Sequence, residues 1–394
     1  MSTCRGGDTP ACIAQASASS GKQQAVWSMA FTQGLLELTM ASTIRINGIG
    51  TASPGTTFTS EEGLRVARMA NSSLSDSELS KLYKDVRIDS RSLVLDPEEM
   101  QERILEPVRA RGQSTRQRLE HYNPAAVALA HRSANIALDR SDRDPGSVTH
   151  LVTVSCTGVE SPGAWLGVHQ ALGLRDDVSR THIGFMGCHG AMNGLAAARA
   201  FAAEDSSNVV LLICMEICSI HYHVGSEFRD QAIANALFAD GAASVIISQV
   251  NQGPVLDCFS SRLFPDTSEL MTWRVGDNGF EMRLSPRVPI VLKRAVSSWI
   301  GQWLEESGLS IEDIGSWAIH PGGRDIVEGV RQGLGLSQDQ MAPSLELLAK
   351  QGNMSSSTVL WIIKRLIDDG CRGSMVAMAF GPGLVGESVL LIDK

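Results

Sequence analysis

The segment RTHIGFMGCHGAMNGLAAARAFAAED, residues 180–205, places Cys188 between a short apolar run and an alanine-rich run. The first run predicts a buried strand, and the second predicts a helix because alanine has the highest helix propensity. Gly187 and Gly190 flank the cysteine and permit a tight turn without a Cβ clash. The pattern therefore predicts a thiol at the corner where a strand ends and a helix begins.

Such a corner favours chemistry at Cys188, because the thiolate is the nucleophilic form of cysteine. The unpaired N–H groups and the dipole of a helix N-terminus favour an anion there. A neighbouring imidazole can take the thiol proton. We expect the corner to expose and acidify the sulfur, and the alternative is an inert structural cysteine.

The composition argues against several functional classes. The formal charge of the 394 residues is −9. The sequence has no dense block of Lys and Arg, which argues against binding to nucleic acid or to an anionic membrane. The sequence contains no run of about 18 uncharged apolar residues, so no membrane span is predicted. The eight cysteines are irregularly spaced, which favours a reducing, cytoplasmic location over a disulfide framework and leaves no zinc-binding pattern. We expect a cytoplasmic protein without a metal site.

The chain divides into an extension and two similar halves. Residues 1–42 are small, polar and turn-rich, which predicts a loosely ordered N-terminal extension. Strands and helices alternate from residue 43 onward, which is typical of a layered α/β fold. The strand that ends at Cys156 resembles a later strand that ends at His320, and the corner at Gly187 resembles a later corner at Gly352. The number of residues between the two members is nearly the same for both pairs. This repetition predicts halves at 43–250 and 251–394.

This duplication would bring Cys188, His320 and Asn353 to one edge of two abutting sheets. His320 follows an apolar strand and precedes Pro-Gly-Gly, although an isolated histidine is commonly a surface or structural residue. Asn353 precedes an apolar helical run, where an asparagine also serves as a simple helix cap. Together, neutral donors from the imidazole and the carboxamide can stabilise an oxyanion or an enolate.

Five motifs in order carry a resemblance to a known family: GFMGCHGAMNGL, ALFADGAAS, IHPGG, GNMSSSTVL and AFGPGLVGESVLL. Over residues 43–394 the chain resembles the type III polyketide synthases, the chalcone-synthase-like branch of the thiolase-fold condensing enzymes. The resemblance implies an α/β thiolase-like fold in α-β-α-β-α layers. It also implies a homodimeric acyltransferase that acts on CoA thioesters without a metal, a cofactor or a carrier protein.

The resemblance implies a role for each member of the cysteine, histidine and asparagine set. Cys188 matches the nucleophile that accepts the acyl group from an acyl-CoA starter. His320 and Asn353 match the pair that binds the carbonyl of the malonyl-CoA extender and stabilises the enolate formed as CO2 leaves. Repetition of this condensation gives pyrone, resorcinol or phloroglucinol-type products.

The family pattern also implies residues that contact the substrate. Two aromatic gatekeepers of the plant enzymes match Tyr222, with His221 as the alternative one residue earlier, and Met282. The others are Cys156 and Thr157 on the cavity wall, Ser355 after Asn353, a floor loop of Phe380, Gly381, Pro382 and Gly383, and Lys81 and Lys84 near the mouth of a CoA tunnel. Cys156 and Ser161 replace plant Thr and Met residues, which favours a bacterial-type cavity.

Other functions remain open on the sequence. A β-ketoacyl-ACP synthase III has the same residue set but performs a single condensation with a carrier protein. A non-catalytic thiolase-fold binding protein is a second alternative. Hydroxymethylglutaryl-CoA synthase is disfavoured, because no Glu stands in a suitable position before the Cys188 motif.

Overall fold

The computed structural model describes residues 43–70, 73–96, 98–100, 102, 113–224 and 229–393. From Thr43 onward the chain forms one compact unit. The predicted N-terminal extension, residues 1–42, lies outside the described residues.

The first half of the compact unit alternates strands and helices, as the sequence predicts. Its elements are β1 (Arg45–Ala52), β2 (Thr57–Thr59), α2 (Ser60–Ala70), α3 (Asp76–Val86), β3 (Ser90–Ser92), α5 (Thr115–Leu119), α6 (Tyr122–Arg140), η2 (Pro145–Ser147), β4 (His150–Ser155), α7 (Ala164–Leu172), β5 (Ser179–Gly184), η3 (Gly187–His189), α8 (Gly190–Glu204), β6 (Val210–Ile217), η4 (Cys218–His221), α9 (Arg229–Leu237) and β7 (Asp240–Ser248).

The second half begins with antiparallel strands and continues into helices and a strand pair. Its elements are β8 (Val255–Leu263), β9 (Met271–Gly276), β10 (Gly279–Leu284), α10 (Val288–Glu306), η5 (Ile311–Asp313), β11 (Ser316–Ile319), α11 (Arg324–Leu334), α12 (Gln338–Gln351), η6 (Ser355–Ser357), α13 (Thr358–Asp368), β12 (Gly373–Gly381) and β13 (Val385–Asp393).

Within the described residues, strands from both halves join in one nine-stranded sheet, ordered β11-β12-β13-β8-β1-β7-β6-β4-β5. β2 pairs with β3, and β9 pairs with β10, in two separate two-stranded sheets. The junction between the halves is short, because β1 and β8 share only the register pair Arg45↔Val255. Two flanking backbone hydrogen bonds support it, from Ile46 N to the Pro254 carbonyl and from Leu256 N to the Ile44 carbonyl. The expected pair of abutting sheets is therefore hydrogen-bonded into a continuous one.

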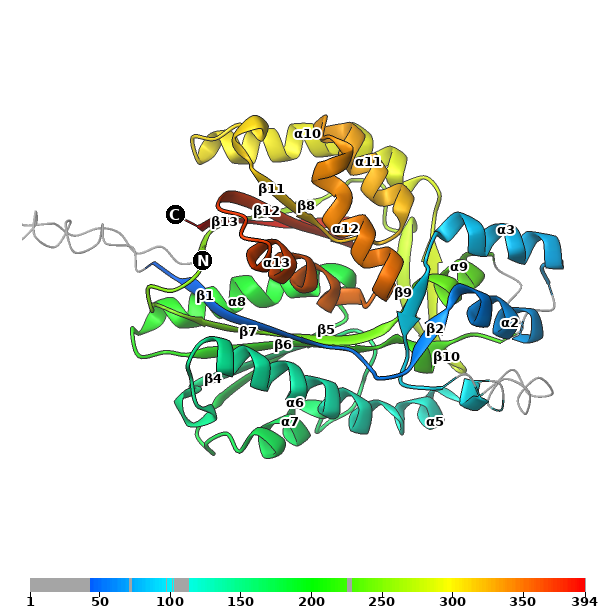
Figure 1. Ribbon diagram of the computed structural model, residues 1–394, viewed down its shortest axis with the longest axis horizontal. Helices are drawn as coiled ribbons and strands as arrows, with labels where there is room; N and C mark the ends of the chain where they lie inside the picture. The colour runs from blue at the N-terminus through cyan, green and yellow to red at the C-terminus, as the bar shows by residue number, and fades with distance from the viewer. Residues whose placement is uncertain are drawn as a thin grey trace, which may run out of the picture. The chain divides into compact units, whose positions relative to one another are not determined.

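Helices cover the sheet on both faces and fill the space between its two parts (Figure 1). α6 packs on β1, β6 and β7, and α7 packs on α6. α8 and α13 lie in the middle, where α8 contacts β4, β6 and β13 while α13 contacts β7 and β11. α10 and α11 pack together over the outer face of the second half. These are the predicted α-β-α-β-α layers, and the predicted fold class is confirmed.

The central layer is tightly packed because small residues let α8 approach the sheet. A Cβ on Gly194 would lie 2.7 Å from Leu212 Cδ1 and 3.0 Å from Val154 Cγ2. Residues of both halves contribute to the central core, including Val154 and Leu195 from the first and Ala377 from the second. The N-terminus of α8 is thereby held against the strands that carry the candidate site.

Candidate active site

Cys188 occupies the corner that the sequence predicts, with one short element added. β5 ends at Gly184, a 3-10 turn spans Gly187–His189, and α8 begins at Gly190. Gly187 has a φ of +72°, and a Cβ at this position would lie 2.3 Å from Pro382 Cδ. Glycine is required there because an L side chain would be strained and would collide with the proline ring.

The thiol lines a small cavity, here called the Cys188 cavity, with about 20 Å³ of free space. Five of the predicted substrate-contacting residues share its wall: Cys156, Thr157, Met282, Ser355 and Pro382. The other lining residues are Gly187, Cys218, Phe238, Met271 and Trp273. The cavity is therefore built from segments that are far apart in the sequence, and most of its wall is apolar.

Asn353 is held beside the thiol with its carboxamide in a defined orientation. Its backbone N donates to the Leu237 carbonyl at 2.9 Å, and its Oδ1 accepts from Ser355 N at 2.8 Å. Because the oxygen is occupied, the Nδ2 hydrogens remain available as donors. Burial raises the pKa of Cys188 to about 12, although hydrogen bonding to Ser355 and Asn353 lowers it. Both side chains thus lie within reach of the sulfur.

His320 directly follows β11 and is almost completely buried, with 1% of its surface exposed. Neither ring nitrogen has a hydrogen-bond partner among the described residues. Burial, together with the nearby His189, lowers the pKa of His320 to about 3, so the ring is neutral. A neutral imidazole offers one donor and one acceptor, and leaving both unpaired costs about 1–3 kcal/mol per group. The ring is therefore available to a ligand.

The structure brings His320 and Cys188 to the same part of the sheet, through β12. His320 N donates to the Met378 carbonyl of β12 at 2.8 Å, and the 3-10 turn that carries Cys188 packs on the same strand. His320 is not among the residues that line the Cys188 cavity. The nearby His189, which helps to lower the pKa of His320, has its ring against Gly381.

The expectation of an exposed, acidified thiol is wrong. Cys188 is 5% exposed, and its pKa is raised by burial and by the nearby Glu216. Burial is the largest cause of the raised pKa, because removal from water disfavours the thiolate. In this structure Cys188 is a thiol and the His320 ring is neutral.

Tyr222 does not line the Cys188 cavity, but it lines a neighbouring cavity together with His221. Tyr222 packs in a separate cluster with Phe58, Val66 and Met354. The aromatic wall is formed instead by Phe238 and by Trp273, whose Nε1 donates to the Cys156 carbonyl at 2.8 Å. Phe238 lies within the ALFADGAAS motif, so a signal for it was present, whereas nothing in the local pattern indicated Trp273.

The predicted floor loop contributes to the cavity only through Pro382. The Phe380 side chain points into the opposite core, where its ring lies 6.4 Å from that of Trp299. Gly381 ends β12 and packs against His189, and Gly383 has a φ of +120°. The side chain of Phe380 is therefore a packing residue, because alternate residues of β12 face opposite layers.

Lys81 and Lys84 lie on α3 with exposed side chains. Lys81 forms an ion pair with Asp85 at 2.8 Å. Neither lysine lines the Cys188 cavity. Their predicted contact with CoA phosphates thus remains a prediction.

Sequence reasoning missed Glu216, a fully buried carboxyl that ties the site together. It accepts hydrogen bonds from Cys156 N at 3.0 Å, from Thr157 Oγ1 at 2.8 Å and from Ser356 Oγ. Burial raises its pKa. The carboxyl links β4 and β6 of the first half to the 3-10 turn after Asn353. In the sequence, the only indication of this role was a single acidic residue within the apolar run VVLLICMEI.

No cluster of three or more His, Cys, Asp or Glu residues in the described ranges has the arrangement of a metal site. Among the helices of those ranges, none combines the length and the apolar character needed to cross a membrane.

The layered halves and the buried thiol at the strand-to-helix corner place the chain among the thiolase-fold acyltransferases. Residues 40–250 match the family model of the chalcone and stilbene synthases, N-terminal domain, and residues 255–393 match that of the C-terminal domain. The chain therefore belongs to the chalcone and stilbene synthase family, and the predicted resemblance is confirmed.

Individual relatives agree with this family. Polyketide synthase 37 of Dictyostelium discoideum is 31% identical over 268 residues, which are 64% of this chain but only 9% of that protein. An alpha-pyrone synthesis polyketide synthase-like protein of Mycobacterium tuberculosis is 30% identical over 357 residues, 88% of this chain and 90% of the relative. The crystal structure of PKS-I from the brown alga Ectocarpus siliculosus superposes with a TM-score of 0.83 at 27% identity, covering 89% of this chain and 98% of that one.

Proposed function

We propose that the chain is a type III polyketide synthase that condenses malonyl-CoA repeatedly onto an acyl-CoA starter, with the growing acyl group carried on Cys188. The observation that carries the proposal is a pair of buried, neutral side chains that the fold brings to the region of the Cys188 thiol. The Asn353 carboxamide is oriented as a donor, and the His320 imidazole has no partner within the described residues. Fixed neutral dipoles in a buried site are what a reaction with two successive oxyanions requires.

In the loading step, the Cys188 sulfur attacks the thioester carbonyl of the acyl-CoA. A new carbon–sulfur bond forms, the bond to CoA breaks, and CoA leaves as a thiolate. A thiol with a pKa of about 12 cannot be ionised beforehand at neutral pH, so its proton leaves as the attack occurs. The neutral His320 ring is the base proposed to receive it.

In the extension step, the malonyl thioester carbonyl accepts hydrogen bonds from a His320 ring N–H and from Asn353 Nδ2. Loss of CO2 leaves its electron pair on the adjacent carbon as an enolate, which these donors stabilise. The carbon attacks the Cys188 thioester, and the sulfur departs as a thiolate. The longer chain, now on CoA, can return to Cys188 for another cycle.

The remaining parts of the proposal concern the substrate and the assembly. Cys156, Thr157, Met282, Ser355 and Pro382 are the proposed contacts of the acyl chain, Gly381 and Gly383 shape the floor, and Lys81 and Lys84 contact CoA. The active unit is a cytoplasmic homodimer without a metal or cofactor, and each half, 43–250 and 251–394, supplies part of every site. Support for a dimer comes from β5, a strand at the edge of the sheet next to the exposed side chains of Phe185 and Met186.

The test is an incubation of the purified protein with acyl-CoA starters of several lengths and malonyl-CoA, without a carrier protein. Multiply extended pyrones or resorcinols, detected by mass spectrometry, are expected, with activity unchanged by EDTA. Strict dependence on a malonyl carrier protein and a single condensation would instead identify a β-ketoacyl-ACP synthase III. Light scattering should give twice the mass of the 42.2 kDa chain.

A further inference from the structure

His221, at the end of the 3-10 turn after β6, is held rigidly by its surroundings. Its Nε2 lies 2.7 Å from the Thr157 carbonyl. Its ring stacks on Phe280 with centroids 3.9 Å apart and meets the edge of Trp273 at 5.9 Å. Trp273 donates to the carbonyl of Cys156, the residue before Thr157. The His221 and Trp273 rings are therefore held by two consecutive peptide carbonyls.

These contacts settle which nitrogen of His221 is free. A carbonyl only accepts hydrogen bonds, so the proton of the neutral ring lies on Nε2 and donates to Thr157. Burial lowers the pKa of His221 to about 3, which keeps the ring neutral. Nδ1 then presents only a lone pair, and it is buried without a hydrogen-bond partner in the described part of the chain. A buried acceptor without a partner indicates a ligand or an ordered water.

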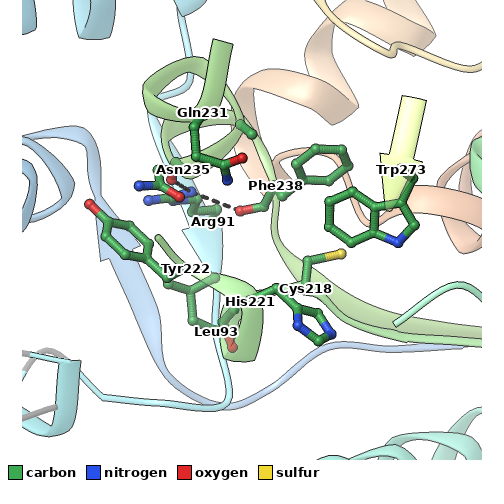
Figure 2. A pocket seen from close by; sticks show the side chains of 11 residues that line it. Arg91, Leu93, Cys218, His221, Tyr222, Gln231, Asn235, Phe238 and Trp273 are labelled. Carbon is green, nitrogen blue, oxygen red and sulfur yellow. Dashed lines mark hydrogen bonds between the residues drawn. The ribbon is translucent and has the colours of Figure 1, made fainter. Parts of the chain in front are cut away.

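The free acceptor lies next to the nucleophile's cavity. His221 lines a neighbouring cavity, shown in Figure 2, together with Cys218, Phe238 and Trp273. These same three side chains line the Cys188 cavity, so the two spaces share a wall. Figure 2 shows the imidazole beside Cys218 and Trp273, whereas Tyr222 points to the opposite side. The shared wall places His221 in the cavity that adjoins the one holding the Cys188 thiol.

We propose that His221 Nδ1 accepts a hydrogen bond from an enol hydroxyl of the β-ketoacyl chain on Cys188 and thereby helps to select which ring closes. This inference rests on the proposed function. A β-ketoacyl chain interconverts between keto and enol forms, and only the enol offers an O–H donor. A fixed lone pair therefore binds the enol form and disfavours a keto oxygen at the same place. Met271 and Met282 in the cavity wall are unbranched side chains that can shift to admit the chain.

The experiment compares the product ratios of three variants with those of the wild type, at a fixed acyl-CoA starter and malonyl-CoA concentration. His221→Phe keeps the stack on Phe280 but removes the acceptor. His221→Gln keeps both a donor for Thr157 and an acceptor. His223→Phe is the matched control, because its ring is also bonded to a backbone carbonyl, that of Phe280, and it lines neither cavity. Loading of Cys188 is measured separately by intact-protein mass spectrometry.

For His221→Phe we expect unchanged loading and a change of about threefold to tenfold in the ratio of ring-closed products, the size of one hydrogen bond. His221→Gln should restore the wild-type ratio, and His223→Phe should leave it unchanged. An unaltered ratio in His221→Phe would mean that Nδ1 binds only water, and an equal shift in His223→Phe would assign the effect to packing. Failure of the wild type to load an acyl group would overturn the proposed function itself, which the loading assay detects independently.

Discussion

At the scale of single residues, the site is a set of buried groups held in their neutral forms. Burial raises the pKa of Cys188 to about 12 and lowers that of His320 to about 3, so neither ion is populated at neutral pH. A neutral pair avoids the desolvation of a buried ion pair. The proton must then move when a thioester arrives, which couples activation of the sulfur to substrate binding.

The raised pKa predicts how Cys188 reacts with iodoacetamide. Because the thiolate is the reactive form, the alkylation rate should rise about tenfold per pH unit from pH 7 to 10 without levelling. Site-resolved mass spectrometry measures the rate, and the urea-unfolded protein, in which a free cysteine titrates near pH 8.5, is the control. A plateau below pH 8 would show a preformed thiolate and contradict the neutral pair.

Removal of the sulfur should separate the two steps of the reaction. Cys188→Ala should abolish acyl loading and chain extension and leave the fold intact, as measured by mass spectrometry and circular dichroism. Cys188→Gln should retain decarboxylation of malonyl-CoA, because His320 and Asn353 remain. Extended product from the alanine variant would refute the assignment of the nucleophile.

At the scale of elements, the 3-10 turn before α8 places the sulfur. Its first residue, Gly187, has a left-handed φ and faces the ring of Pro382 from the end of β12. The turn therefore fits only if the loop after β12 lies where it does. This contact joins the turn that carries Cys188 to the second half of the chain. It is possible because Gly187 has no Cβ.

We expect Gly187→Ala to be damaging for two reasons that a control can separate. The φ of +72° costs a non-glycine residue about 1–2 kcal/mol, and the collision with Pro382 adds to it. Gly173→Ala has a similar φ, +63°, but no atom lies within 4 Å of the added Cβ. Urea denaturation should show a loss of about 1 kcal/mol for Gly173→Ala and of more than about 2 kcal/mol for Gly187→Ala. Only Gly187→Ala should lower kcat/KM by about tenfold or more, and equal losses in both variants would contradict the role of the Pro382 contact.

At the scale of the whole molecule, the halves are joined mainly by their common core. The β1–β8 junction has a single register pair, whereas α13 packs on β7 of the first half and on β11 of the second. The exposed Arg140–Asp368 ion pair, at 2.7 Å, also crosses between the halves. Apolar burial in the central layer should therefore dominate over this ion pair.

Two substitutions test this ranking. Leu360→Ala removes a fully buried side chain of α13 and should lower the free energy of unfolding by about 2–5 kcal/mol. Asp368→Asn weakens this pair and the pair between Asp368 and Lys364, and should still lower the free energy of unfolding by less than about 1 kcal/mol. Denaturant unfolding measures both, and a larger loss for Asp368→Asn would reverse the ranking.

The predictions that succeeded share a local origin. The corner at Cys188 and the layered order of elements follow from runs of apolar residues, glycines and helix formers, which act over a few residues. Met282 and Ser355 were located by their place in short motifs, and both line the Cys188 cavity. The failures concern direction and environment. Tyr222 was preferred to His221, and neither residue lines the Cys188 cavity. The acidity of the thiol was inferred from the helix N-terminus and a neighbouring imidazole, without the cost of burial.

What the sequence by itself determined is the family, the order of strands and helices, and the corner that carries Cys188. The tertiary structure decided which side chains face the cavity, because neighbouring residues of an extended segment point to opposite sides and a difference of one position changes the wall. It also decided the protonation of Cys188, His320 and His221, since the pKa of each depends on how much water the folded chain excludes. Burial arises only when the layers pack together, so it cannot be inferred from a short segment of the chain.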